Sequence, residues 1–348
     1  QDILYMGSEF LQRSMNQGET WERISGDLTN GAKEGNVAFG TISTISESKF
    51  QFGLLYAGSD DGKIHVSKDG GVSWQLISGN LPQNLWVSRV VASSHKKERV
   101  YATLNGYRSD NFESYAYVSE DFGATWTSIS NGLTQAVNVI VEDSANENIL
   151  YVGTDNGLFI SLDKGITWQD FSNGMPKVAI HDAVIQTKAK ELIVGTHGRS
   201  IYKMDISKVQ EVTKEVLAKN LHLFKVNDRT KSERWGSQNY AWGKPSEPSQ
   251  TIWFYSNADG IVNVSITNEA GMLVHAQKVE AKKGLNSFAY NYLLSKEVAE
   301  KWNKKDKNIK IKEAENKKFY LPVGKYKMTV SKDKVTETKS FEVTAPKK

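Results

Sequence analysis

The residues of this chain whose types and spacing could do chemistry are acidic side chains in a repeated pattern. Asp69, Asp121 and Asp163 each hold the third position of Ser-x-Asp-x-Gly-x-x-Trp, and Asn16 holds it in a fourth copy. Two carboxylates that flank a glycosidic bond can cleave it. Because each aspartate belongs to the turn of its own repeat, we expect these carboxylates to lie far apart and to be structural.

The repeated pattern predicts a hairpin turn. Its third residue can accept hydrogen bonds from nearby backbone amides, and its glycine supplies a positive φ. Its tryptophan begins the next strand and can bury the indole ring between repeats. The copies end at Trp21, Trp74, Trp126 and Trp168, roughly 40–50 residues apart, which is the period of a repeat architecture.

The elements that carry these turns follow one order of four strands. An inner, a second and a third strand precede each turn, and a fourth begins at the tryptophan. Four antiparallel strands per repeat are typical of a β-propeller blade. We therefore predict an all-β chain with a partial propeller of about four to five blades over 1–205. Its inner strands are predicted at 41–46, 87–92, 137–142 and 180–185.

The predicted propeller is incomplete at both ends. Residues 1–24 supply the second to fourth strands of a blade, and residues 180–205 supply the first to third strands of another. An open propeller would leave unpaired backbone at its edges. We expect the missing strands to come from an N-terminal portion of the same protein or from another chain, and we expect cleavage upstream of Gln1.

A second domain is predicted after the propeller. Residues 206–249 are expected to form a helix and a linker, with Val209, Val212 and Val216 on one face of the helix. Residues 250–348 contain six alternating runs separated by turn signals, which predict a small Ig-like β-sandwich. A lysine-rich insertion near 294–318 interrupts it. We expect this insertion to be a solvated surface, with contact to anionic glycans or lipid head groups as the alternative.

The mouth of the predicted propeller is the expected ligand site, because loops before the inner strands and after the second strands meet there. Aromatic, arginine and histidine side chains on neighbouring blades suit a peptide or a sugar. Alternatively, Arg89, Asp182 and Arg199 pair as ties between blades, and His197 only shapes a turn. The candidates are Trp86, Arg89, Tyr107, Arg108, Asp110, Asp155, His181, Asp182, His197 and Arg199.

The composition argues against several classes of function. The net charge of +4 is too small to indicate nucleic-acid binding by itself, and the absence of cysteine removes disulfides and thiolate chemistry. No apolar run approaches the roughly 20 residues that span a bilayer. We expect no cofactor and no metal, because the histidines are scattered and Asp60-Asp61-Gly62, which could bind calcium, is more simply a hairpin turn.

A family resemblance rests on the repeated turns and on further stretches of both domains, among them Leu150 to Gly157, Val194 to Tyr202 and Leu321 to Tyr326. The turns resemble the Asp-box, or BNR, repeats of sialidases, sortilin-type receptors and two-propeller xyloglucanases. The whole chain is more similar to the sortilin-like BNR-repeat proteins of Bacteroidetes. The resemblance implies a secreted, periplasmic or outer-membrane surface protein of which this chain is the C-terminal portion. No arginine here matches the carboxylate clamp of a sialidase.

Two functions follow from these observations. We predict a non-catalytic propeller protein of the bacterial cell envelope or surface, which binds protein or peptide and forms part of a larger assembly. The alternative is a glycoside hydrolase or glycan-binding protein whose site is completed by the missing blades. The repeat does not decide between them, because it is a folding device. The carboxylates available to the alternative are Asp60, Asp61, Asp110, Asp155 and Asp182.

Overall fold

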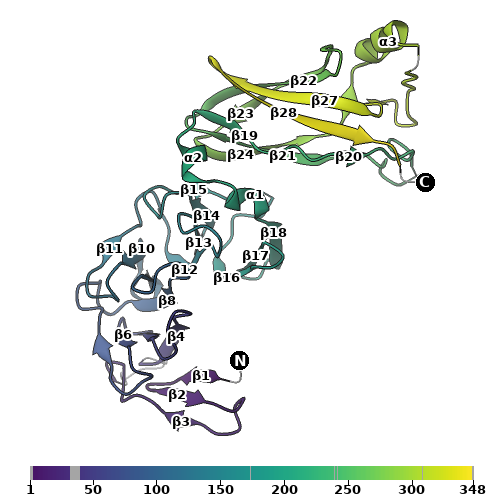
Figure 1. The fold of residues 1–348 in the computed structure, drawn as a ribbon. Helices are drawn as coiled ribbons and strands as arrows, with labels where there is room; N and C mark the ends of the chain where they lie inside the picture. The colour runs from purple at the N-terminus through teal and green to yellow at the C-terminus, as the bar shows by residue number, and fades with distance from the viewer. Residues whose placement is uncertain are drawn as a thin grey trace. The chain divides into compact units, whose positions relative to one another are not determined.

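The computed structural model describes residues 3–31, 40–172, 174–238, 240, 242–307 and 309–346. They fall into two compact units, Gln1–Gln210 and Glu211–Lys348, which are described separately. The chain is all-β in character, as predicted, with small antiparallel sheets in the first unit and longer strands in the second (Figure 1). No helix in the described ranges is long and apolar enough to cross a membrane.

The first unit is a series of five small antiparallel sheets, numbered here as blades 1 to 5 in chain order (Figure 1). Blade 1 contains β1 (Leu4–Gly7), β2 (Leu11–Ser14) and β3 (Glu22–Arg23). Blade 2 contains β4 (Ile42–Glu47), β5 (Leu55–Ser59), β6 (Ile64–Ser67) and β7 (Gln75–Leu76). Blade 3 contains β8 (Trp86–Ala92), β9 (Val100–Gly106), the 3-10 turn η1 (Tyr107–Ser109), β10 (Asn111–Ser119) and β11 (Thr127–Ser128).

Blade 4 contains β12 (Val137–Glu142), β13 (Leu150–Thr154), β14 (Gly157–Ser161) and β15 (Gln169–Asp170). Blade 5 contains β16 (Ile180–Gln186), β17 (Glu191–Thr196) and β18 (Ile201–Asp205). The inner strands β4, β8, β12 and β16 contact one another in that order. Within the described ranges, blade 1 has no inner strand and blade 5 has no fourth strand. The partial propeller predicted from the repeat is therefore present.

The four repeated turns share one hydrogen-bond pattern. The serine hydroxyl accepts the backbone N–H of the turn's glycine at 2.7 or 2.8 Å. The side chain of the third residue accepts the N–H four positions further on at 2.9 Å, and Asn16 makes this bond as the aspartates do. Hydrogen bonds from Ser73 and Ser67 lower the pKa of Asp69 to about 2. Each carboxylate is thus engaged in its own blade.

The tryptophans of blades 2 to 4 join each turn to the preceding blade. The indole N–H donates to a backbone carbonyl of that blade at 2.7–2.9 Å. The acceptor is in each case the isoleucine three residues after the preceding tryptophan. The donor and acceptor pairs are Trp74 with Ile24, Trp126 with Ile77, and Trp168 with Ile129.

A buried ion network joins blades 3 and 4 at the ends of their strands opposite the mouth. Arg99 is 4% exposed and lies 2.7 Å from Glu120, 3.1 Å from Glu147 and 3.4 Å from Glu142. The Tyr101 hydroxyl donates to Glu142 at 2.9 Å, and burial raises the pKa of this tyrosine above its usual value. Loss of Arg99 would be the most destabilising change here, because the Glu142 side chain, 2% exposed, would stay buried without its cation.

The second unit has two sheets around one apolar core. Its sheet orders are β19–β21–β24 and β20–β28–β27–β22–β23. The core takes Phe254 from the first sheet and Ile266, Met328 and Phe341 from the second. All six runs predicted after residue 250 are strands, and the Ig-like topology stays a prediction. The strands are β19 (Leu221–Leu223), β20 (Arg229–Thr230), β21 (Gln250–Ser256), β22 (Gly260–Asn268), β23 (Leu273–Ala281), β24 (Gly284–Tyr290), β27 (Gly324–Lys332) and β28 (Val335–Thr344).

The segment 206–249 contains more structure than a helix and a linker. Two separate helical turns, α1 (Ser207–Gln210) and α2 (Lys214–Leu217), stand where one helix was predicted. Strands β19 and β20 also come from this segment, and β20 pairs in parallel with β28. These strands are three and two residues long, so alternation of residue types could not reveal them.

The lysine-rich insertion consists of a short hairpin and a helix. The hairpin pairs β25 (Leu293–Leu294) with β26 (Phe319–Tyr320), and α3 (Lys296–Lys305) lies between them in sequence. The Ser295 hydroxyl caps α3 by accepting the Val298 N–H at 3.2 Å. Lysines of α3 are exposed as expected, but Ala299 and Trp302 are buried in the core of the unit. The solvated surface predicted for the insertion is therefore found at the lysines of α3, while the face with Ala299 and Trp302 is buried.

Candidate ligand-binding site

The candidate residues from sequence lie at one end of the blades, where inner strands begin and second strands end. Trp86 opens β8 and pairs in register with Asn105, the residue before the end of β9. Tyr107 and Arg108 follow in η1. In blade 5, Ile180 pairs with Thr196, which places His181 and His197 at the same end of their sheet. Loop residues from several blades therefore contribute to one mouth.

An aromatic cluster occupies the blade 3 part of the mouth; it comprises Trp86, Tyr107 and Arg108. The two rings meet edge to face with centroids 6.0 Å apart. The Arg108 guanidinium lies 5.6 Å from the Trp86 ring centroid and 5.9 Å from that of Tyr107. Its Nη1 is 3.0 Å from Asp60 Oδ2 in blade 2, and hydrogen bonds to Tyr107 and Asp60 raise the pKa of Arg108. The cluster is thus oriented, while Tyr107 stays 48% exposed.

The buried side-chain amides of Asn105 and Asn138 form hydrogen bonds that hold the loop of the aromatic cluster. Asn105 Oδ1 accepts the backbone N–H of Tyr107 at 2.9 Å, which fixes the start of η1. The Asn105 amide donates to Asn138 Oδ1 at 2.7 Å, and the Asn138 amide donates to Asp155 Oδ1 at 2.8 Å. This chain of bonds connects blade 3 to blade 4. Asp155, one of the candidate carboxylates, is therefore engaged in positioning the loops rather than free at the mouth.

An ion pair crosses between inner strands two blades apart. Arg89 Nη2 of β8 lies 2.7 Å from Asp182 Oδ1 of β16, with the inner strand of blade 4 between them in the series. Arg89 Nε is buried without a hydrogen-bond partner in the described part of the chain. A pocket of 220 Å³ lies between β8, β12 and β16, and Arg89, Val139, Val141 and Val184 are among its lining residues. The tie between Arg89 and Asp182, one of the two interpretations left open by the sequence, is present.

The blade 5 part of the mouth holds two histidines. The rings of His181 and His197 lie 5.3 Å apart, and both side chains are exposed. Arg199 is also exposed, and no ion pair involving it occurs among the described residues, so it does not join the tie formed by Arg89 and Asp182. Gly198 has a φ of +70°, as the turn interpretation of this stretch expects. Asp110 is exposed with a φ of +53°.

Asp60 and Asp61, in the hairpin between β5 and β6, accept hydrogen bonds from protein N–H groups. Asp60 Oδ1 accepts the N–H groups of Gly40 and Thr41 at 2.9 and 2.8 Å. Asp61 is 1% exposed and accepts the N–H of Asn30 at 2.6 Å. No group of three or more side chains suited to a metal ion occurs within the described residues. Both aspartates are therefore bound to backbone groups of the segment that precedes β4.

Register shifts that the sequence did not reveal shape the mouth. Each inner strand has a bulge at its second or third residue, where one extra residue faces the second strand. The Ser43 hydroxyl donates to the Val87 carbonyl at 2.8 Å, and the Ser88 hydroxyl donates to the Val137 carbonyl at 3.0 Å, so these bulges bind the next blade. The bulge residues are Ser43, Ser88, Asn138 and His181.

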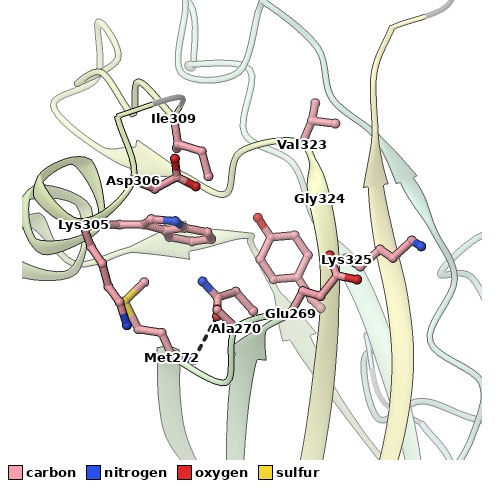
Figure 2. Close-up of a pocket in the computed structure, with 12 residues that line it drawn as sticks. Glu269, Ala270, Met272, Lys305, Asp306, Ile309, Val323, Gly324 and Lys325 are labelled. Carbon is pink, nitrogen blue, oxygen red and sulfur yellow. Dashed lines mark hydrogen bonds between the residues drawn. The ribbon is translucent and has the colours of Figure 1, made fainter.

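The second unit has a separate pocket of 540 Å³ between α3 and the ends of β22 and β27. Trp302 and Tyr326 form part of its wall, with ring centroids 6.3 Å apart. Figure 2 shows Lys305 and Asp306 on one side of this pocket and Glu269 on the other. Charges of both signs around the pocket favour no single class of ligand.

Fold and turns together define a partial β-propeller with Asp-box turns. Residues 9–136 match the family model Sortilin-Vps10, described as sortilin, neurotensin receptor 3. This range spans three of the four repeated turns. No curated protein matches the chain.

Several solved structures are similar in fold. A GH74 enzyme from Niastella koreensis is 23% identical with a TM-score of 0.45, over 59% of this chain and 34% of its own. An ancestral GH74 enzyme is 15% identical with a TM-score of 0.46, over 84% and 37%. The GH74 xyloglucanase from Xanthomonas campestris is 11% identical with a TM-score of 0.46, over 98% and 52%. The chain thus spans between a third and about half of the length of these structures.

Proposed function

We propose that the mouth of this propeller binds a glycan. The aromatic cluster of Trp86, Tyr107 and Arg108 carries the proposal, because it places an exposed aromatic ring beside a guanidinium that Asp60 already orients. Sites for small polar ligands typically combine aromatic surface with a few fixed polar groups. The apolar face of a sugar ring suits the Tyr107 ring, and its hydroxyls suit the neighbouring charged groups.

Cleavage of the glycan is a further step that needs two carboxylates on either side of the bond, roughly 5–9.5 Å apart. Of the candidate carboxylates at this mouth, Asp60, Asp155 and Asp182 are each bound to protein groups, and the exposed Asp110 alone does not make a pair. Binding needs no such pair. We therefore propose glycan binding as the function of these residues, and we assign any cleavage by the longer protein to carboxylates outside them.

The glycan hypothesis agrees with the names of the similar solved structures, which are GH74 enzymes, one of them a xyloglucanase. Their TM-scores are too low for this agreement to carry an argument, so the aromatic cluster is the support for the proposal.

A binding measurement tests the proposal. A glycan array with the 348-residue chain, followed by calorimetry on the best ligand, should show binding that Tyr107→Ala weakens at least tenfold, or about 1.4 kcal/mol. Phe52→Ala is the matched control, since Phe52 is an exposed aromatic residue that lies before β5, away from the mouth. Loss of affinity in both variants, or in neither, would refute the assignment. Turnover assays on the longer protein measure cleavage separately.

Peptide binding is the second candidate, and the pocket between β8, β12 and β16 favours it. Val91, Val139, Val141 and Val184 give this pocket a largely apolar wall, which suits a peptide side chain better than a sugar. The partly unpaired Arg89 guanidinium would then meet a peptide carbonyl or carboxylate. Selective capture of short peptides by the wild-type chain, lost in a folded Val184→Asp variant of this exposed lining residue, would support this candidate over the first.

The proposal also covers how the propeller is closed and where in the cell the protein works. We propose that the partial propeller closes with blades from the N-terminal portion of a longer protein or from a partner chain, and that the protein works in the periplasm, at the outer-membrane surface or outside the cell. The second statement rests on the resemblance to sortilin-like BNR-repeat proteins. Cell fractionation with an antibody against this chain tests it, and a cytoplasmic signal alone would contradict it.

A further inference from the structure

Contacts between neighbouring blades share one arrangement of residues. Blade 1 has the residues that a later blade contributes to such a contact, but no described blade precedes it. In the contacts of blade 1 with 2, 2 with 3 and 3 with 4, the later blade contributes its box tryptophan, its box glycine and alternate residues of its second strand. The earlier blade contributes the isoleucine directly after its last strand and the backbone carbonyl of that isoleucine. At the contact between blades 2 and 3, a methyl group added at Gly123 would lie 2.3 Å from Ile77 Cδ1, so the two blades touch with no space between them.

Blade 1 carries the later-blade half of this contact fully formed. The Asn16 turn has the same hydrogen bonds as the other three, so Gly18 and Trp21 are held in the usual positions. Nothing among the described residues occupies the other side. A methyl group at Gly18 would meet only Leu4 and Trp21, at 3.5 and 3.7 Å. Trp21 is 39% exposed, and its indole N–H has no acceptor in the described ranges.

Strand register strengthens the comparison. Leu4 pairs with Ser14 of its box, as Leu55, Val100 and Leu150 pair with the serines of theirs. Those three side chains are fully buried, whereas Leu4 is 44% exposed. Two residues further along each strand the same contrast recurs. Met6 is 47% exposed, while its equivalents Ala57, Ala102 and Val152 are at most 2% exposed.

Hydrogen bonding along β1 also indicates that a neighbour is missing on one side of blade 1. The second strands of the other blades, β5, β9, β13 and β17, are each bonded to a strand on both sides. β1 is bonded to β2 alone among the described strands. Its other edge offers unpaired N–H and C=O groups, which a further strand can satisfy.

We propose that the face of blade 1 formed by Leu4, Met6, Gly18 and Trp21, called here the docking face, binds a further Asp-box blade together with an inner strand for β1. The bound blade presents a backbone carbonyl to the Trp21 indole. Three residues after its own tryptophan it carries isoleucine or a similarly bulky apolar residue, which packs on Gly18. This inference is independent of the glycan proposal, because it uses none of the mouth residues.

A second copy of this chain cannot supply that blade. Of the described blades, blade 5 has neither a fourth strand nor a repeated turn. Phe171 of blade 4 stands three residues after Trp168, in the required position, but in a second copy blade 5 already follows blade 4, with β16 in contact with β12 and β13. The docking face therefore requires a blade from outside these residues.

The chain's own segments provide a defined probe. In an extended chain, residues 86–190 are repeated directly before residue 3, so that a second β16 can pair with β1 and a second Phe171 can reach Gly18. Trp21→Phe removes the indole N–H and keeps an aromatic ring. In the 348-residue chain this variant should leave the Tm unchanged, whereas Trp126→Phe should lower it. In the extended chain Trp21→Phe should lower the Tm as Trp126→Phe does. A folded extended chain that stays insensitive to Trp21→Phe overturns the proposal.

A second measurement does not depend on folding of the extended chain. Met6 and Met15 are exposed at this side of blade 1, at 47% and 52%, so peroxide should oxidise them rapidly in the 348-residue chain. In native protein purified from its source cells, a docked blade should slow oxidation of Met6 on the order of tenfold. Met272 of the second unit is the internal control and should react equally in both. Equal reactivity of Met6 in the two preparations overturns the proposal.

Discussion

Replacement of a box glycine by alanine tests how closely the blades pack. Gly123 has a φ of +88°, and an added methyl group would lie 2.3 Å from Ile77 Cδ1 and 3.0 Å from Ile77 Cβ. Gly18 holds the same position in blade 1 with a φ of +96°, yet its nearest neighbour would be 3.5 Å away. The two substitutions therefore share a backbone effect and differ in the contact with a preceding blade.

The expected magnitudes follow from these two components. Alanine at positive φ costs about 1–2 kcal/mol at either position. Forcing a methyl group into the packed contact between blades 2 and 3 costs a further ~1–3 kcal/mol at Gly123 alone. Gly123→Ala should thus destabilise the first unit by about 2–5 kcal/mol and Gly18→Ala by about 1–2 kcal/mol. In a unit of this size each kcal/mol corresponds to roughly 2–4 °C in Tm.

Calorimetry and urea unfolding of the two variants measure this difference. The urea m-value should stay constant, so that a shift in midpoint reports stability. Equal destabilisation by the two substitutions would refute the inference that the box glycine is required by its contact with the preceding blade. In the extended chain, Gly18→Ala should become as costly as Gly123→Ala.

Three further predictions concern the turns, the buried ions and the second unit. Asp69 has a folded-state pKa of about 2 against its usual 3.8, so its carboxylate stabilises the fold above about pH 4 and this contribution is lost as the pH falls towards 2. Asp69→Asn should flatten the pH dependence of unfolding between pH 2 and 4 in urea titrations, and an unchanged profile would contradict the hydrogen-bond pattern. Arg99→Leu leaves Glu142 buried without its cation and should cost about 3–5 kcal/mol; a loss within error in chemical denaturation would show that the network is not coupled. Trp302→Ala removes a buried ring from the core of the second unit and should cost about 3–5 kcal/mol, with near-ultraviolet circular dichroism as the measurement and an unshifted midpoint as the contrary result.

The propeller could be predicted because the residues that specify each blade's turn lie close together in the sequence. Each Asp-box turn depends on a few neighbouring residues, so the pattern from Ser67 to Trp74 specifies its own hydrogen bonds whatever the rest of the chain does. Repetition then identifies the blades, and the alternation of apolar residues identifies their strands. For the same reason, the sequence could predict that carboxylates such as Asp69 belong to separate turns.

The details of the mouth depend on distant pairings, and sequence reasoning found only some of them. The tie between Arg89 and Asp182 was one of two open interpretations. The orientation of Arg108 by Asp60 was not foreseen, because it joins residues of different blades. The bulge near the start of each inner strand was also missed. Its signal is a polar residue such as Ser88 at a position where alternation expects an apolar one.

A blade that follows blade 5 would both continue the propeller and add residues to the mouth. In blades 2 and 3 the bulge residues Ser43 and Ser88 bind the inner strand of the following blade. The corresponding residue of blade 5 is His181, which instead lies beside His197 at the exposed side of the mouth. By the same geometry, a following blade would place its inner strand beside His181. A ligand at this mouth would then contact blades on both sides of the histidine pair. We therefore expect native protein with a closed propeller to bind the glycan more tightly than the 348-residue chain, and Tyr107→Ala to weaken binding in both.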